Sequence, residues 1–455
     1  MDLSALALAD AYGTGTATPA AAAEHCLARI AAQDAKLGAY QAVYAEEARR
    51  LAEAAGAALA AGGRIGPLHG VPFALKDLID IEGRVTTWGS RLTAERVSPA
   101  TGLLARRLLG AGAVLLGKTK TVECAFGGWG TNTVMGTPWN PWDLETARAP
   151  GGSSSGSGVA VAAGMASFAI GTDTGGSVRM PAAFCGIVGL KVTEGVLPCD
   201  GIMPLSHTLD TPGPMTRTVR DAALVLEVMR GTEAAAIEAD LAAPDGRFAA
   251  LGRGVGGLRL GVLGQAERDL VSAPILATYD EALARLEAMG ADCVAFEPPT
   301  RHVDLAERNF VISSSEAFAH HGARFIEPAA PVDASVRARM LRGKDIAAAA
   351  YIQALQERPR EQARWRDAMA GLDAILTPST LCEPPPLDTI DPATAPAEFT
   401  RPYNYLGMCA LALPIGLTAS GLPASLQIAA RAHDEWGAMR IGAALEEATP
   451  RLPAL

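Results

Sequence analysis

The residues most able to do chemistry gather between positions 149 and 195, a segment unusually rich in glycine and serine. It opens with APGGSSSGSG at Ala149–Gly158 and continues to GTDTGGSVR at Gly171–Arg179. Runs of this composition are often flexible linkers. Here apolar segments lie on both sides, whereas linkers mark domain edges. Glycine beside serine instead lets the backbone approach a bound group closely, which favours a binding loop.

Two short motifs match other kinds of chemistry. GAVLLGKT at Gly112–Thr119 fits the phosphate-loop pattern GxxxxGK[ST], in which a strand leads through a glycine loop into a helix. The four residues between its glycines are themselves a candidate strand, so we interpret the motif as a strand that ends in a surface lysine, Lys118. GSSSG at Gly152–Gly156 fits the GxSxG elbow, but no later histidine stands in a distinctive context for a Ser-His pair.

Metal and cofactor chemistry find no support in the sequence. HExxH, CxxC and dense His/Asp clusters are absent, so we predict no metal site and no cofactor. The seven cysteines are scattered from Cys26 to Cys409 and are odd in number. This pattern is typical of reduced thiols in a cytosolic protein.

Several long motifs occur in the order found in the amidase signature family, which the chain resembles over most of its length and most strongly from 66 to 220. They are LHGVPFALKD at Leu68–Asp77, GTPWNPWD at Gly136–Asp143, the segment Gly151–Lys191 that begins with GGSSSGSG, and GLPASLQIAA at Gly421–Ala430. The resemblance implies a Ser-cisSer-Lys hydrolase that works without a cofactor. It also implies a homodimer.

The resemblance assigns a catalytic triad residue by residue. The nucleophile is Ser177 in GGSVR, and the lysine is Lys76 in ALKD. The bridging residue is Ser153, which follows a cis peptide bond in the family and lies 24 positions before the nucleophile.

The chemistry of these side chains agrees with the assignment. A serine hydroxyl attacks efficiently only when a base takes its proton, and lysine is a base only when it is neutral. Burial lowers the pKa of lysine, and Val71, Phe73 and Leu75 predict apolar surroundings for Lys76.

Successive backbone amides before the nucleophile predict an oxyanion hole, because two glycines leave no Cβ to block the approach. Its members are Thr174, Gly175, Gly176 and Ser177. Asp173 and Arg179 flank this segment, and we expect them to brace the loops through charged hydrogen bonds. We expect Ser154 to support Ser153 or a loop amide.

The region 118–130 departs from the family pattern. The family usually has Asn-Met and Phe where this chain has Lys120-Thr121 and Cys124. We expect the glycine-rich stretch that follows to form a wall of the substrate pocket, made of Gly127, Gly128, Trp129 and Gly130. These departures leave the substrate open.

The sequence therefore predicts an amidase that acts on a small linear amide or carbamate through an acyl-enzyme on Ser177, with Ser153 relaying protons to Lys76. One alternative is a carbamate, urethane or urea-derivative hydrolase of the same family. Another is the A subunit of a tRNA-dependent amidotransferase, although the chain is somewhat short for it. The segment RPYN at Arg401–Asn404 also lacks the substrate pattern of that subunit.

The elements that must position these residues alternate between strands and helices. We expect strands at 71–78, 113–116, 258–263, 293–296, 372–377 and 410–417, and helices at 101–111, 159–168, 273–289 and 436–447. A strand, a helix and a strand in succession favour a parallel crossover. The pattern predicts a single α/β/α layered domain over 1–455 with a large mixed twisted sheet, a helical region at 1–62, and a helical insertion at 303–370 that caps the site.

Composition and charge indicate what kind of protein this domain is and where it is located. The chain has 455 residues, of which 49% are hydrophobic and 19% charged, so a large core is expected and disorder is not. A net charge of −10 argues against nucleic acid as a partner. The N-terminus has no basic, apolar leader pattern, and no apolar stretch is long enough to span a bilayer. We therefore expect a cytoplasmic protein without a membrane partner.

Overall fold

The computed structural model describes residues 1–455 and contains one mixed sheet of eleven strands. The strands are β1 Tyr40–Val43, β2 Pro72–Lys76, β3 Val114–Thr119, β4 Phe168–Asp173, β5 Val188–Lys191, β6 Thr211–Thr216, β7 Arg259–Leu263, β8 Asp292–Phe296, β9 Ala374–Pro378, β10 Cys409–Leu417 and β11 Pro423–Ala430. Their order is β1-β3-β2-β4-β6-β5-β10-β11-β9-β7-β8. The strand β2 is parallel to β3 and β4, and β7 is parallel to β8 and β9, whereas the other pairs are antiparallel.

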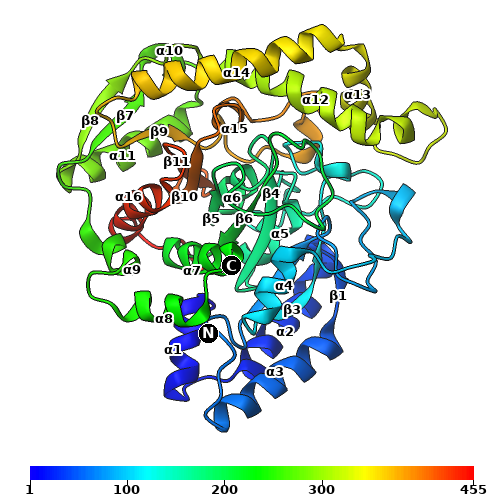
Figure 1. Cartoon of the computed structure of the whole chain (residues 1–455), viewed down its shortest axis with the longest axis vertical. Coiled ribbons are helices and arrows are strands. Elements are labelled where there is room, and N and C mark those ends of the chain that lie inside the picture. Colours follow the sequence, from blue (N-terminus) through cyan, green and yellow to red (C-terminus); the bar gives the residue numbers. More distant parts are fainter.

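Sixteen α-helices surround the sheet (Figure 1). They are α1 Ala5–Thr14, α2 Pro19–Leu37, α3 Ala45–Ala60, α4 Leu103–Gly110, α5 Ser155–Ala162, α6 Arg179–Cys185, α7 Val219–Arg230, α8 Ala234–Ala242, α9 Arg247–Ala250, α10 Gln265–Arg268, α11 Ala273–Ala288, α12 His302–Ile326, α13 Ala334–Arg342, α14 Ala348–Ala368, α15 Arg401–Tyr405 and α16 Glu435–Ala448. Short 3₁₀ turns lie at Arg91–Thr93, Glu123–Ala125, Leu251–Arg253, Gly343–Asp345 and Leu387–Thr389. None of the helices combines the length and apolar character needed to cross a membrane.

Helices cover both faces of the sheet, as two contacts of neighbouring strands demonstrate. Gly189 of β5 lies so close to α6 that an added Cβ would sit 2.6 Å from the Cβ of Ala182. Leu411 of β10 instead packs against Gly442 of α16. Since Gly189 is paired with Ala412, Leu411 points to the opposite face. The predicted α/β/α layering around a mixed sheet is confirmed.

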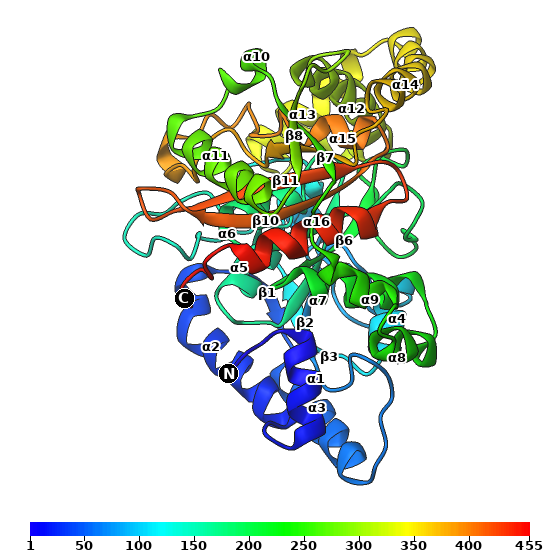
Figure 2. The same cartoon turned by 90° about the vertical axis from the view of Figure 1, so that its left-hand side faces the viewer.

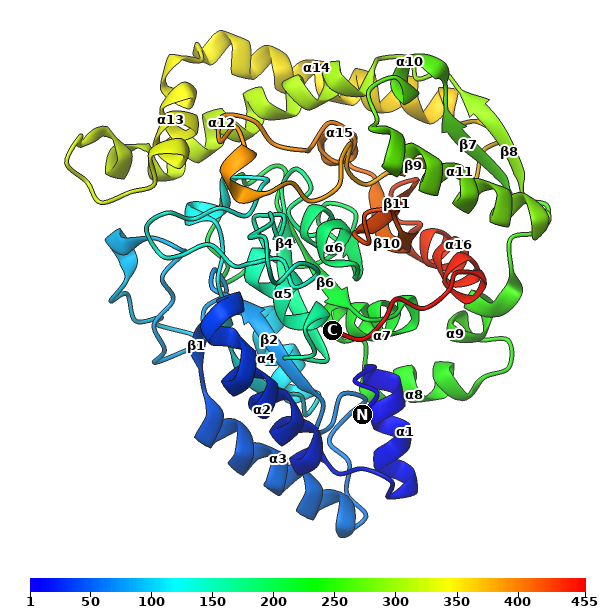
Figure 3. The same ribbon diagram turned by 180° about the vertical axis from the view of Figure 1, so that it is seen from behind.

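The first three helices and the helices α12–α14 lie at opposite ends of the molecule (Figures 1 and 3). Turning the molecule by 90° shows α16 and α7 alongside the strands in the middle of the molecule (Figure 2). Most of the apolar interior forms one cluster of 84 buried residues. A separate cluster of 12 buried residues joins the loop 122–126 to α12 and α13, and the rings of Phe126 and Phe310 within it lie 6.0 Å apart. This cluster fixes the two helices beside that loop.

The region 155–168 differs from the predicted helix at 159–168. Helix α5 begins at Ser155 and ends at Ala162, and β4 begins at Phe168. The first turn is rich in glycine because it packs against backbone: a Cβ on Gly156 would collide with the carbonyl of Ala39 and lie 2.6 Å from the backbone nitrogen of Lys120. Hydrophobic periodicity cannot detect a helix start whose residues are small because they pack against backbone.

The prediction that Lys118 ends a strand at the surface is wrong. It lies inside β3 and is fully buried. Its Nζ is 3.2 Å from Asp77 Oδ1 and donates to Thr86 Oγ1 at 3.0 Å. The match is strand from Val114 to Thr119, so no phosphate loop forms. The lysine is tolerated in the core because a carboxylate neutralises it.

Gly156→Ala should lower the free energy of unfolding by about 1–3 kcal/mol, because the added Cβ overpacks a rigid backbone contact. Urea denaturation measures the change. Gly13→Ala in α1 is the matched control: its Cβ would meet nothing within 4 Å, so stability should hold or rise slightly. Equal effects of the two substitutions would contradict this packing.

Candidate active site

Lys76 ends β2 at the centre of the parallel part of the sheet and is fully buried. Its Nζ donates to Ser153 Oγ at 2.7 Å and to Thr172 Oγ1 at 2.8 Å. Burial lowers the pKa of Lys76 to about 7, while the negative charges of Asp210 and Asp173 raise it. Burial therefore favours the neutral amine, which is the form that can act as a base.

Ser153 lies in a loop that is pressed against another glycine-rich loop. The Gly152–Ser153 peptide bond is cis, as the family resemblance implies. The Ser153 carbonyl accepts from Val122 N–H at 3.1 Å, and Gly152 N–H donates to the Gly128 carbonyl at 2.7 Å. A Cβ on Gly152 would lie 2.7 Å from Gly130 Cα, so this approach requires glycine.

Ser177 follows β4 and precedes α6, at the wall of a cavity. It is 7% exposed, and its hydroxyl has no hydrogen-bond partner in the chain. Its carbonyl accepts from Ser154 N–H at 3.2 Å, which holds the two serine loops together. The structure thus joins Lys76 to Ser153 by a hydrogen bond and brings Ser177 to the same loop through backbone, without a hydrogen bond between the two hydroxyls.

The segment 174–177 presents free amides, with one exception. Thr174, Gly175 and Ser177 have N–H groups without an acceptor in the chain. Gly176, predicted as a fourth donor, instead donates to Asp173 Oδ1 at 2.6 Å. The backbone of Gly176 has a φ of 118°, and an added Cβ would collide with Thr400. The glycine turns this amide toward the carboxylate and away from the cavity.

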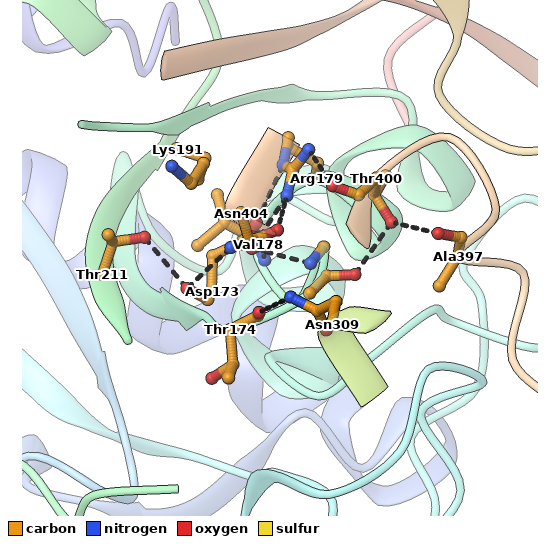
Figure 4. A network of polar contacts seen from close by, with 12 residues as sticks. Asp173, Thr174, Val178, Arg179, Lys191, Thr211, Asn309, Ala397, Thr400 and Asn404 are labelled. Atoms are coloured by element: carbon orange, nitrogen blue, oxygen red, sulfur yellow. Dashed lines mark hydrogen bonds and ion pairs between the residues drawn. The ribbon is translucent and has the colours of Figure 1, made fainter. Parts of the chain in front are cut away.

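Behind this segment lies a fully buried ion pair between Asp173 and Arg179 (Figure 4). The guanidinium binds both carboxylate oxygens at 3.0 Å and also donates to the Thr400 carbonyl at 2.9 Å and to Asn404 Oδ1 at 2.5 Å. The carboxylate accepts further from Val178 N–H at 3.2 Å. Burial raises the pKa of Asp173, but the charge and hydrogen bonds of Arg179 hold this pKa well below its usual range. The pair holds the 174–177 turn against α15.

Ser154 and Thr172 connect the serine loop to β4. Thr172 N–H donates to Ser154 Oγ at 3.3 Å, and Ser154 Oγ lies 3.3 Å from the Thr172 carbonyl. Because Thr172 also accepts from Lys76, these contacts fix the lysine, the loop and the strand relative to one another.

A cavity of about 440 Å³, including its open mouth, lies beside Ser177. Of the predicted pocket wall, Gly127 and Gly128 line it. Trp129 and Gly130 do not: the indole stacks on Phe184 at 6.3 Å and donates to Thr394 Oγ1 at 3.2 Å, and Gly130 packs on the serine loop. Further lining residues come from α12, α13 and α15: Asn309, Phe310, Ser313, Arg339 and Arg401.

Comparison with known proteins places the chain in a family. A sequence model of the family described as Amidase matches residues 21–437. The chain belongs to the amidase family. The match spans most of the chain, and it includes every residue placed in the site above.

Individual amidase relatives differ in what they do. The chain is 34% identical to the A subunit of the glutamyl-tRNA(Gln) amidotransferase of Synechococcus sp. (strain RCC307), covering 97% of this chain and 96% of that protein. It is 36% identical to the 2-amino-5-chloromuconic acid deaminase of Comamonas testosteroni, covering 90% and 88%. The solved native peptide amidase from Stenotrophomonas maltophilia has a TM-score of 0.83, with 31% identity over 99% of this chain and 98% of that one.

Sequence reasoning missed Asp210, which lies beside the candidate site. Asp210 accepts from the Leu205 and Ser206 N–H groups at 2.8 and 3.0 Å and is bonded by the Thr174 hydroxyl. Burial raises the pKa of Asp210 to about 6, while Lys76 lowers it. The surrounding residues, SHTLDT at 206–211, contain no glycine and no repeated acidic pattern that would indicate this role. Only the pairing of β4 with β6 brings it near.

Arg179→Met should lower the free energy of unfolding by about 3–5 kcal/mol, because it leaves the Asp173 carboxylate buried and unpaired. Chemical denaturation measures this change. The double variant Asp173→Asn/Arg179→Met should lose less than the sum of the two single variants, because it removes both charges. Strict additivity would show that the two side chains do not depend on each other.

Proposed function

We propose that this amidase-family enzyme hydrolyses linear carboxylic amides through an acyl-enzyme on Ser177. The observation that carries the proposal is the 2.7 Å hydrogen bond from the buried amine of Lys76 to Ser153, beside a cavity that Ser177 lines. A lysine whose pKa is lowered to about 7 by burial supplies the base that a serine nucleophile requires.

Acylation begins when the Ser177 hydroxyl, which no partner holds, turns toward Ser153. Ser153 takes the Ser177 proton and passes its own proton to the neutral amine of Lys76. The Ser177 oxygen bonds to the substrate carbonyl carbon, and the carbonyl oxygen becomes an oxyanion. The free amides of Thr174, Gly175 and Ser177 donate hydrogen bonds to the oxyanion, and such donors stabilise its charge strongly.

Leaving-group departure reverses the proton path. The C–N bond breaks as the nitrogen takes a proton from Ser153, which Lys76 replenishes, so ammonia or an amine leaves and an ester of Ser177 remains. Water then attacks this ester, giving one proton to the same relay, and Ser177 is released with a carboxylic acid. A carbamate C–N bond can follow the same steps, and we keep carbamate and urea derivatives as alternative substrates.

A second candidate is supported by the amidotransferase A subunits among the relatives. In that role the chain would act with a partner and a tRNA-bound substrate. Turnover of small amides by the purified chain, without a partner or tRNA, would support the first candidate. Turnover that appears only with them would support the second.

Ser177→Ala should abolish amide turnover and covalent labelling by a fluorophosphonate. The other two hydroxyl side chains of the cavity wall are committed to the protein: Thr174 donates to Asp210, and Ser313 donates to the Phe310 carbonyl. Ser155→Ala is the matched control: this buried hydroxyl has no hydrogen-bond partner, so activity and labelling should persist. Mass spectrometry of the labelled peptide identifies the modified residue. Labelling that survives in Ser177→Ala would contradict the assignment.

The rate of acylation should rise with pH through about 7, since only the neutral form of Lys76 accepts a proton and its pKa is about 7. Lys76→Met should reduce acylation by at least about 100-fold. Asp210→Asn removes a negative charge that favours the ammonium form, so its profile should shift to lower pH. A rate independent of pH between about 6 and 8 in the native enzyme would contradict a lysine base.

A further inference from the structure

Two arginines line the cavity beside Ser177, and neither forms an ion pair with a carboxylate. They are Arg339 of α13 and Arg401 at the start of α15. Unpaired cations are costly to bury in a protein interior. Their presence next to the proposed nucleophile calls for a partner that the chain itself does not supply.

Arg401 lies directly against the oxyanion segment. An added Cβ on Gly175 would be 3.0 Å from Arg401 Cγ, so the stem of the side chain packs on this glycine. The guanidinium carbon lies 5.3 Å from the ring centre of Phe310 and makes no hydrogen bond to the protein. The protein therefore uses none of the donors of this guanidinium, which leaves them free to bind a ligand.

Arg339 is held in place by neutral acceptors only. Its Nε donates to the Phe126 carbonyl at 2.7 Å, its Nη1 to the Pro392 carbonyl at 2.5 Å, and its Nη2 to Ser335 Oγ at 3.1 Å. Burial lowers the pKa of Arg339 to about 10, with Arg401 adding to this effect and Asp333 opposing it. The side chain thus remains a fixed positive charge at neutral pH.

Neither arginine forms an ion pair with the acidic groups nearby. Glu398 and Glu307 nevertheless oppose the lowering of the Arg401 pKa by burial. Asp333 is occupied by the Thr133 N–H and hydroxyl at 2.9 and 2.7 Å and by the first turn of α13. Glu307 is exposed on the surface of α12. Glu398 is the remaining carboxylate, and burial raises its pKa, although Arg401 lowers it. A third cation, Arg342, stacks on Phe310 from α13 at 4.5 Å.

We propose that the acyl part of the substrate carries a carboxylate, which the guanidinium of Arg401 binds while Arg339 adds positive potential. The substrate class is a monoamide of a dicarboxylic acid or an amide of similar charge. Guanidinium and carboxylate pair through two parallel hydrogen bonds, and a half-enclosed cavity strengthens the attraction. The protein as a whole carries a charge of −10, so this preference belongs to the site and not to the overall field. The inference rests on the proposed function.

The test compares two series of primary amides: malonamate, succinamate, glutaramate and adipamate, and the neutral ω-hydroxy amides of the same chain lengths. For the best chain length, kcat/KM should favour the anionic amide by at least about tenfold, as hydrogen bonds to charged groups contribute. Arg401→Gln should remove this preference, mainly through KM, and leave the hydroxy amides within about threefold. Glutamine retains the Cγ that packs on Gly175. Arg401→Lys should restore part of the preference.

Two controls separate this inference from the proposed function. Fluorophosphonate should still label Ser177 in Arg401→Gln, which shows that the nucleophile and its base remain functional. Equal use of both series by the native enzyme, or an equal loss of both in Arg401→Gln, would overturn the inference while leaving an amidase.

If no amide of either series is hydrolysed, the proposed function fails, and calorimetry still decides the inference. Glutaramate and glutarate are titrated into Ser177→Ala and into Ser177→Ala/Arg401→Gln. The carboxylate site is supported if the ligands bind Ser177→Ala and bind the double variant at least about tenfold more weakly. Equal affinities, or no binding to either, overturn it.

Discussion

The hydrogen bond between the Lys76 amine and Ser153 Oγ is the interaction on which the site depends. It exists because β2 is inserted between β3 and β4, with helices on both faces, so that the end of this strand is dry. A lysine there loses most of the hydration that stabilises its ammonium form. Burial at this position thus lowers the pKa of a side chain that is ordinarily charged, as the proposed role of Lys76 as a base requires.

The remaining elements keep that amine aligned with the proposed reacting atoms. Asp173 and Arg179 fix the turn that carries Ser177, and the turn's own Gly176 amide is committed to this bracing. The serine loop is held by backbone contacts with Gly128 and Gly130 that no side chain could replace. Charged hydrogen bonds therefore fix the turn that carries Ser177, and close contacts at glycines fix the serine loop, although neither segment is part of a strand.

The sequence predicts six of the eleven strands and several helices from local patterns, but not β1, β4, β5, β6 or β11. Long motifs assign the serines and the lysine that we propose for the site. It predicts apolar surroundings for Lys76 but places Lys118 at the surface, although the two lysines lie in similar apolar runs and both are buried. Leu75, not Lys76, is paired with Lys118 in the register of β2 and β3, so the two lysines point to opposite faces. One meets Ser153 and the other meets Asp77. Asp210 and Arg401 were missed for the same reason: tertiary pairing alone brings them to the site.

The protonation state of Lys76 is the most direct test of a lysine base. The chain has few lysines, so NMR of ¹³Cε-labelled lysine resolves their titrations one by one, with Lys76→Met assigning the signal. Burial of the amine predicts that the signal lost in this variant titrates near 7. A Lys76 signal that titrates at about 10, the ordinary value for lysine, would contradict it.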